Sequence, residues 1–210
     1  MKKAHEVLDN FAIMMTSHPK QQRWLERTLE SFEGCSYPIY FGYDDNKVPR
    51  ELEELIPEDI NVTGYPKGKL GHARGELFQM QMLIDLIKED GYKYFYKTAG
   101  DCVHYRWRGF SEILRILNMK DFDLVCRGTS MIFGKVDVFH AIMEPWSTET
   151  QAGSAEGYLK HRARRLEARV YPLKAENWEL ILGRIHVQGE YALNQGIPVS
   201  DTWKFGEIWK

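Results

Sequence analysis

Cysteine is scarce in this sequence, and its few positions fit neither a metal-binding nor a disulfide pattern. Cys35, Cys102 and Cys126 are the three cysteines, and no two of them have the C-x-x-C spacing. An odd count without that spacing argues against a zinc site and against a disulfide framework. We therefore expect the protein to work in a reducing cytoplasm.

The sequence also lacks long apolar runs and a strong charge of one sign. No stretch of about 18 uninterrupted apolar residues occurs, so we expect no transmembrane helix. Glu6 and Asp9 precede the short apolar run 11–15 and argue against a signal peptide. The net charge of −2 provides no basic field for nucleic acid. Because neither repeats nor low-complexity linkers divide the 210 residues, we expect a single domain over 1–210.

What the sequence does contain is an alternation of apolar strands with amphipathic helices. We expect strands at 11–15, 38–43, 60–63, 92–97, 123–127 and 131–133. Helices are expected around 24–32, 76–88 and 110–117. This alternation predicts an α/β fold with a mainly parallel central sheet flanked by helices.

Polar residues follow three of the expected strands. These strand ends carry Thr16-Ser17-His18, Asp44-Asp45 and Gly100-Asp101. In parallel α/β sheets, ligands bind beyond the carboxyl ends of the strands. We therefore expect these residues to line one continuous crevice.

A loop rich in glycine leads into the helix expected at 76–88. It contains Gly64, Gly68, Gly71 and Gly75, together with the basic side chains of Lys69, His72 and Arg74. The amino terminus of a helix suits phosphate, and arginine can add bidentate hydrogen bonds. The G-x-x-x-x-G-K-[ST] pattern is absent, so this is not a Walker loop.

The order and spacing of these motifs resemble the inverting GT-A glycosyltransferases, especially family 2. The family's first strand, turn and helix resemble AIMMTSHPKQQRWLERTLESF, and its second strand, which ends in acidic residues that contact the base, resembles IYFGYDD. Its Gly-x-x-x-Ala-Arg-Asn-x-Gly segment resembles GKLGHARGELFQMQ, and its metal-binding Asp-x-Asp lies where this chain has YFYKTAGDCV. Its acceptor segment resembles GSAEGYLKHRARRLEARVYPL. Together these segments span residues 10 to 172.

The resemblance implies a single GT-A-like, Rossmann-like domain. Its implied activity is transfer of a sugar from a nucleotide-diphosphate sugar to an acceptor hydroxyl, with inversion. Residues 10–130 would form the nucleotide-sugar-binding half. Residues 131–210 would form the acceptor-side half and a carboxyl-terminal tail.

The donor is expected to contact residues from the strand ends and from the glycine-rich loop. These residues are Thr16, His18, Asp44, Asp45, Lys69, His72, Arg74 and Gly100. Carboxylates such as those of Asp44 and Asp45 accept hydrogen bonds from a base N–H or a ribose hydroxyl. The alternative for Asp44-Asp45-Asn46 is a solvated turn.

A divalent cation and a general base complete the implied chemistry. Asp101, assisted by His186, is expected to hold Mn²⁺ or Mg²⁺ at the diphosphate, since both ions prefer oxygen donors. The alternatives are that Asp101 caps a turn and that His186 is a core histidine. Glu156 is expected to deprotonate the acceptor hydroxyl. Its alternative is a helix-start glutamate favoured by the helix dipole.

Two other functions stay open. A non-catalytic nucleotide- or glycan-binding protein of the same fold is indicated by the single carboxylates at Asp101 and Glu156, where the family has pairs. A nucleotidyltransferase is the other, although residues 16–20 lack the glycine and arginine usual in the first loop of those enzymes. The acceptor is by default a glycan intermediate. The basic segment 161–169 leaves a modified base in DNA as a second acceptor.

Overall fold

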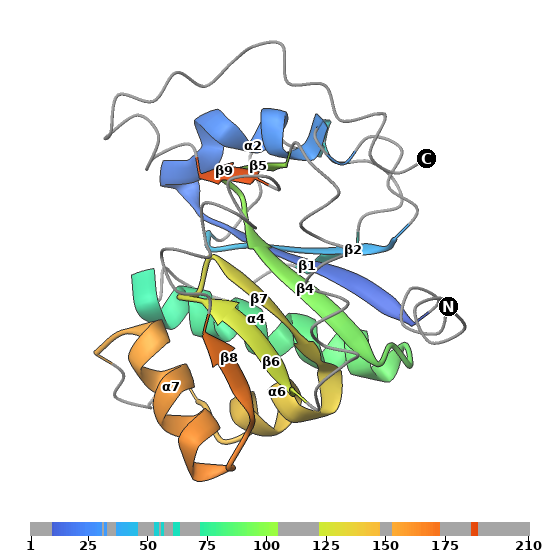
Figure 1. Ribbon diagram of the computed structural model, residues 1–210. Coiled ribbons are helices and arrows are strands. Elements are labelled where there is room, and N and C mark those ends of the chain that lie inside the picture. The colour runs from blue at the N-terminus through green and yellow to red at the C-terminus, as the bar shows by residue number, and fades with distance from the viewer. Residues whose placement is uncertain are drawn as a thin grey trace.

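The computed structural model describes residues 10–30, 32, 37–45, 53, 54, 56, 61–63, 72–104, 122–147, 153–172 and 186–188. Within these ranges strands and helices alternate along the first half of the chain, and Figure 1 shows how they are arranged.

Seven strands form one sheet in the order β3-β2-β1-β4-β7-β6-β8. They are β1 Phe11–Ser17, β2 Ile39–Tyr43, β3 Asn61–Thr63, β4 Tyr94–Ala99, β6 Leu124–Arg127, β7 Met131–Lys135 and β8 Val170–Pro172. The pairs β1–β2, β1–β4, β2–β3 and β6–β8 are parallel, whereas β7 is antiparallel to β4 and β6. A separate antiparallel pair joins β5 Cys102–His104 to β9 His186–Gln188.

Both faces of the large sheet are covered at its centre. Successive residues of a strand point to opposite faces, and all seven residues of β1 are buried. On one face, Ala12 and Met14 pack in a core with Leu83 of α4 and Phe139 of α6. Figure 1 shows α4, α6 and α7 together on one side of the sheet, with α2 and the β5–β9 pair on the other side.

Four helices surround the sheet in the described part of the chain. A 3-10 turn, η1 Pro19–Gln21, leads directly into α2 Gln22–Glu30, and the remaining helices are α4 His72–Glu89, α6 Val136–Met143 and α7 Ala155–Arg165. The α7 helix starts at a serine cap, where Ser154 Oγ accepts a hydrogen bond from Gly157 N at 3.0 Å. Such a cap satisfies one of the free N–H groups of the first turn.

The α/β fold with a mainly parallel sheet flanked by helices, as expected from the sequence, is confirmed. The strands expected at 11–15, 38–43, 92–97, 123–127 and 131–133 correspond to β1, β2, β4, β6 and β7. The helix expected at 110–117 lies outside the described residues. None of the described helices has the length and apolar character needed to cross a membrane.

One boundary expected from the sequence is wrong. The helix expected at 76–88 begins at His72, so His72, Arg74 and Gly75 belong to its first turn and not to a loop. Glycine lowers helix propensity by about 1 kcal/mol relative to alanine. That penalty is small for a helix of 18 residues whose apolar stripe is buried in the core.

Candidate functional site

The candidate site lies where the order of the strands reverses. The chain passes from β1 outward to β2 and β3, and then returns to place β4 on the opposite side of β1. The helix that follows β1, α2, and the helix that precedes β4, α4, therefore lie on opposite faces of the sheet. In open α/β sheets, this reversal point is where ligands bind.

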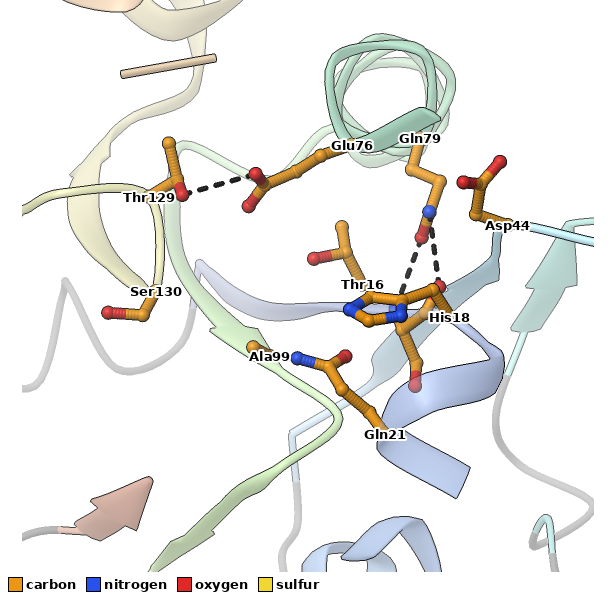
Figure 2. A pocket seen from close by; sticks show the side chains of 10 residues that line it. Thr16, His18, Gln21, Asp44, Glu76, Gln79, Ala99, Thr129 and Ser130 are labelled. Carbon is orange, nitrogen blue, oxygen red and sulfur yellow. Dashed lines mark hydrogen bonds between the residues drawn. The ribbon is translucent and has the colours of Figure 1, made fainter. Parts of the chain in front are cut away.

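A cleft of about 110 Å³ opens at this point (Figure 2). Its walls come from the ends of β1, β2 and β4, from one face of α4 and from the turn before β7. Because β7 runs antiparallel to β4, the start of β7 lies at the same sheet edge as the end of β4. The lining residues are Thr16, Ser17, His18, Gln21, Asp44, Glu76, Gln79, Ala99, Thr129 and Ser130.

Gln79 joins α4 to the end of β1. Its side-chain oxygen accepts a hydrogen bond from Ser17 N at 3.2 Å, and its Nε2 donates to Ser17 O at 3.1 Å. The side chain is 2% exposed, and both of its polar ends are used. Gln79 therefore continues the backbone pairing of β1 where the strand leaves the sheet, and it fixes the floor of the cleft.

Glu76 presents a carboxylate to the cleft, and hydrogen bonds from neighbouring residues fix its position. Lys97 Nζ, fully buried in β4, donates to Glu76 Oε1 at 2.8 Å and also to the carbonyl oxygen of Thr129. Thr129 Oγ1 donates to Glu76 Oε2 at 3.2 Å. A buried lysine requires such a partner, because an unpaired buried charge is strongly disfavoured. The network ties α4, β4 and the turn before β7 together around the cleft.

Asp44 lies against the first turn of α4. Its backbone N–H donates to Ser17 O at 2.9 Å, which brings the ends of β2 and β1 together. A Cβ added at Gly75 would collide with the Asp44 carboxylate, so Gly75 leaves the space that this carboxylate occupies. The amino terminus of a helix stabilises a carboxylate in this position.

Gly100 has a similar role at the end of β4. Its N–H donates to Thr16 O at 2.8 Å, and its carbonyl oxygen accepts from Thr28 Oγ1 of α2 at 2.9 Å. A Cβ at this position would collide with the Ser17 side chain. Gly100 therefore allows the ends of β1 and β4 to approach each other, and it does not itself line the cleft.

Asp101 is buried beneath the cleft. It is 1% exposed, and its Oδ1 accepts a hydrogen bond from Gln21 Nε2 at 2.8 Å. Gln21 is the residue that lines the cleft here. Burial, with the Asp101 carboxylate next to it, raises the pKa of the Cys102 thiol to about 12. The thiol thus stays protonated at neutral pH and is not a nucleophile.

Two buried polar atoms of the cleft lack a partner in the described structure. They are Ser17 Oγ and Gln21 Oε1. Buried polar groups are almost always hydrogen-bonded, and an unpaired one costs about 1–3 kcal/mol. Both atoms are buried in the wall of the cleft, and Ser17 Oγ lies against Gly100.

The described residues do not make a metal site on their own. Within the described ranges, no three His, Cys, Asp or Glu side chains gather in a group that could hold an ion. At Asp101, one of the two carboxylate oxygens, Oδ1, accepts a hydrogen bond from the amide of Gln21. The backbone of His186 pairs with His104, three residues beyond Asp101, and its side chain lies outside the description. The expected Mn²⁺ or Mg²⁺ site at Asp101 and His186 stays a prediction.

The other residues expected to contact the donor fall into three groups. Thr16, His18 and Asp44 line the cleft. Asp45 is half-buried and Arg74 is exposed, and neither belongs to the lining. Lys69 lies outside the described residues, and of His72 the position at the start of α4 is described but not the side chain.

Glu156 lies apart from the cleft, in the first turn of α7. Its Oε1 forms an ion pair with Lys160 Nζ at 2.5 Å, and its carboxylate lines a second cavity between α7 and the sheet. A Cβ at Gly128 would be 3.7 Å from Glu156 Oε2. Gly128 lines this second cavity, whereas Thr129 and Ser130 line the cleft. The turn 128–130 therefore borders both cavities. The role of Glu156 as a base stays a prediction.

Sequence reasoning missed several residues of the cleft. Gln21, Glu76, Gln79, Thr129 and Ser130 were not singled out, although all five line it. A signal existed for Glu76 and Gln79, which are polar residues within the otherwise apolar stripe of a helix. Comparison of the chain with protein-family models and with curated proteins gave no match.

Proposed function

We propose that the chain is a glycosyltransferase that binds a nucleotide-diphosphate sugar in this cleft and transfers the sugar to an acceptor hydroxyl. The observation that carries the proposal is the position of the cleft at the reversal of strand order, beyond the carboxyl ends of β2, β1 and β4. Nucleotides bind at this position in doubly wound sheets.

The chemistry of the lining supports a hydroxyl-rich ligand. Asp44 and Glu76 provide carboxylate oxygens, and Thr129 and Ser130 provide hydroxyl groups. Ribose and sugar hydroxyls donate to such acceptors. Because the Asp44 carboxylate already lies against the amino terminus of α4, the charge of a diphosphate would need the proposed divalent cation.

The acceptor side of the proposal involves Glu156. Its carboxylate lies beside Gly128, the residue that precedes the two cleft residues Thr129 and Ser130. We assign it the task of accepting the proton from the hydroxyl of a glycan acceptor. A cytoplasmic protein fits this proposal, since the described thiols of Cys102 and Cys126 are both free.

A second candidate is a protein that binds the nucleotide without catalysis. The observation in its favour is Asp101, whose buried carboxylate is engaged by Gln21 at the position where the family holds its metal. Release of sugar from the donor distinguishes the two candidates, because binding alone does not cleave the bond to the diphosphate.

The first test is a thermal-shift screen with UDP, GDP, CDP and ADP, each with and without Mn²⁺. The proteins are wild type, Asp44→Asn and the matched control Asp45→Asn, whose side chain does not line the cleft. We expect one nucleotide to raise the melting temperature of wild type and of Asp45→Asn, and to have a much smaller effect on Asp44→Asn. An absence of any shift in wild type would refute the nucleotide-sugar proposal.

The second test measures nucleotide release from the matching sugar donor in the presence of candidate acceptors. Glu156→Gln is expected to lower the transfer rate by about 100-fold or more, as for loss of a general base, with nucleotide binding retained. Binding without turnover in wild type would favour the non-catalytic candidate.

A further inference from the structure

A second cavity, of about 300 Å³, lies between α7 and the large sheet. Its walls are formed by β6, β7 and β8 of the sheet and by α6 and α7. The polar cleft opens beyond the strand ends, whereas this cavity lies against the face of the sheet. It shares no lining residue with the cleft.

The cavity exists because α7 packs through small side chains. Its inward face carries Ala155, Leu159 and Ala163 at a spacing of four residues, and all three are buried. Two of these three are alanines, so they fill little of the space between helix and sheet. A close-packed core would leave few voids larger than a water molecule. The space under α7 is thus far larger than ordinary packing leaves.

The interior of the cavity is apolar. Strand, helix and loop residues line it with aliphatic and aromatic groups, namely Leu124, Ile132, Phe139, Ile142, Leu159, Ala163, Ala168 and Val170. Ligand pockets of proteins are about 300–1,000 Å³ and are lined mainly by such side chains, with few polar groups. The half-buried thiol of Cys126 also lines the cavity.

The charged residues of the lining come from a second stripe of α7. Glu156, Lys160 and Arg164 follow one another at the same spacing of four, and all three are exposed. Glu156 is paired with Lys160 at 2.5 Å. In the part of the chain that the structure describes, no ion pair engages Arg164, and the stripe therefore carries one surplus positive charge.

We propose that this cavity binds an anionic amphiphile with a single acyl chain. The chain lies in the apolar space under α7, and the carboxylate head lies at the exposed stripe, where Arg164 and then Lys160 donate to it. Arginine presents a planar donor pair that matches a carboxylate. The proposal rests on the cavity and its charges and does not depend on nucleotide-sugar transfer.

The test is isothermal titration calorimetry with octanoate and decanoate, and with 1-octanol and 1-decanol as neutral counterparts. Arg164→Gln is compared with Arg165→Gln, a neighbouring exposed arginine that does not line the cavity. We expect Arg164→Gln to weaken decanoate binding roughly five- to tenfold. Its affinity for decanol is unchanged, and Arg165→Gln binds both ligands as wild type does. Decanoate binds roughly tenfold tighter than octanoate, as two buried methylenes predict.

A labelling experiment locates the ligand. Decanoate at saturation is expected to slow alkylation of Cys126 at least about fivefold, because the bound chain covers the thiol. Ala163→Leu, which fills part of the cavity, is expected to reduce decanoate binding. Three results would each overturn the proposal: no decanoate binding to wild type, equal loss in Arg164→Gln and Arg165→Gln, or an unchanged rate at Cys126. If Ala163→Leu fails to fold, the arginine pair and Cys126 still decide.

Discussion

At the scale of single residues, Gly75 and Gly100 both leave space for a neighbouring side chain. The two neighbouring side chains differ in how easily they can move away. At Gly75 a Cβ would meet the far end of Asp44, a side chain that can rotate away. At Gly100 it would meet Ser17, including Ser17 Cβ at 2.6 Å, which is fixed by the backbone of β1. The same substitution by alanine should therefore affect ligand binding at one position and stability at the other.

Gly75→Ala is expected to displace the Asp44 carboxylate from the cleft and leave the fold intact. Alanine favours a helix over glycine by up to about 1 kcal/mol, so the free energy of unfolding should stay equal or rise slightly. Affinity for the nucleotide found by thermal shift should fall about tenfold or more, as for loss of a hydrogen bond to a charged group. Calorimetry and denaturant unfolding measure the two quantities. Gly153→Ala, where a Cβ meets nothing within 4 Å, is the control. Unchanged affinity in Gly75→Ala would contradict the role of Asp44.

Gly100→Ala is expected to lower the free energy of unfolding by about 1–3 kcal/mol, the usual effect of overpacking. The reason is the collision with Ser17, which pushes the ends of β1 and β4 apart. Urea denaturation measures the loss. The double variant Ser17→Gly, Gly100→Ala removes the collision and should recover part of the stability lost. A double variant that is as unstable as the sum of both single changes would show that the collision is not the cause.

At the scale of elements, Asp123 connects the ends of three strands. Its carboxylate accepts from Lys135 Nζ at 2.9 Å at the end of β7, and from Arg169 N at 3.0 Å and Nε at 3.2 Å ahead of β8. Partial burial raises the pKa of this carboxyl, but the hydrogen bonds from Arg169 and Lys135 outweigh it and lower the pKa from 3.8 to about 2. The folded state thus favours the charged carboxylate.

This shift predicts how the stability gained from Asp123 depends on pH. Because the pKa is lower in the folded state, the stabilisation is complete above the unfolded pKa of 3.8 and is lost as pH falls through it toward about 2. Asp123→Asn should be less stable than wild type at pH 7, and the difference should shrink between about pH 4 and pH 2. Urea unfolding of both proteins across pH 2–7 checks this. A difference that does not change with pH would mean that the carboxylate charge is not responsible.

The elements also show what the sequence could predict. Uninterrupted apolar runs such as 11–15 and 92–97 located the central strands, because a strand buried on both faces must be apolar throughout. The same logic could not locate the cleft residues Gln79 and Thr129. Their roles depend on contacts with Ser17 and Glu76, which lie far from them in the chain. It also could not show that Asp101 is buried under Gln21, because a carboxylate directly after a strand is equally typical of an exposed turn.

At the scale of the whole molecule, the parts differ in how firmly they are held. β1 pairs with both β2 and β4, over five and six residue pairs, at the centre of the sheet. α4 buries a continuous stripe that includes Leu77, Leu83 and Ile87. By contrast, β8 is an edge strand with three residue pairs, and α7 covers a cavity with Leu159 and Ala163.

This difference predicts the order of amide hydrogen exchange in the native state. Amides of β1, β4 and α4 should exchange with the free energy of global unfolding, while those of α7 and β8 should exchange at least roughly tenfold faster, through local opening. Exchange followed by mass spectrometry on peptides covering 11–17, 72–89, 94–99 and 155–172 measures both groups. Decanoate should slow exchange in 155–172 and leave 11–17 unchanged, because a ligand under α7 replaces the packing that the alanines do not provide. Equal protection of both groups without ligand would mean that α7 and the central strands unfold as one unit, so that the cavity does not weaken the attachment of the helix.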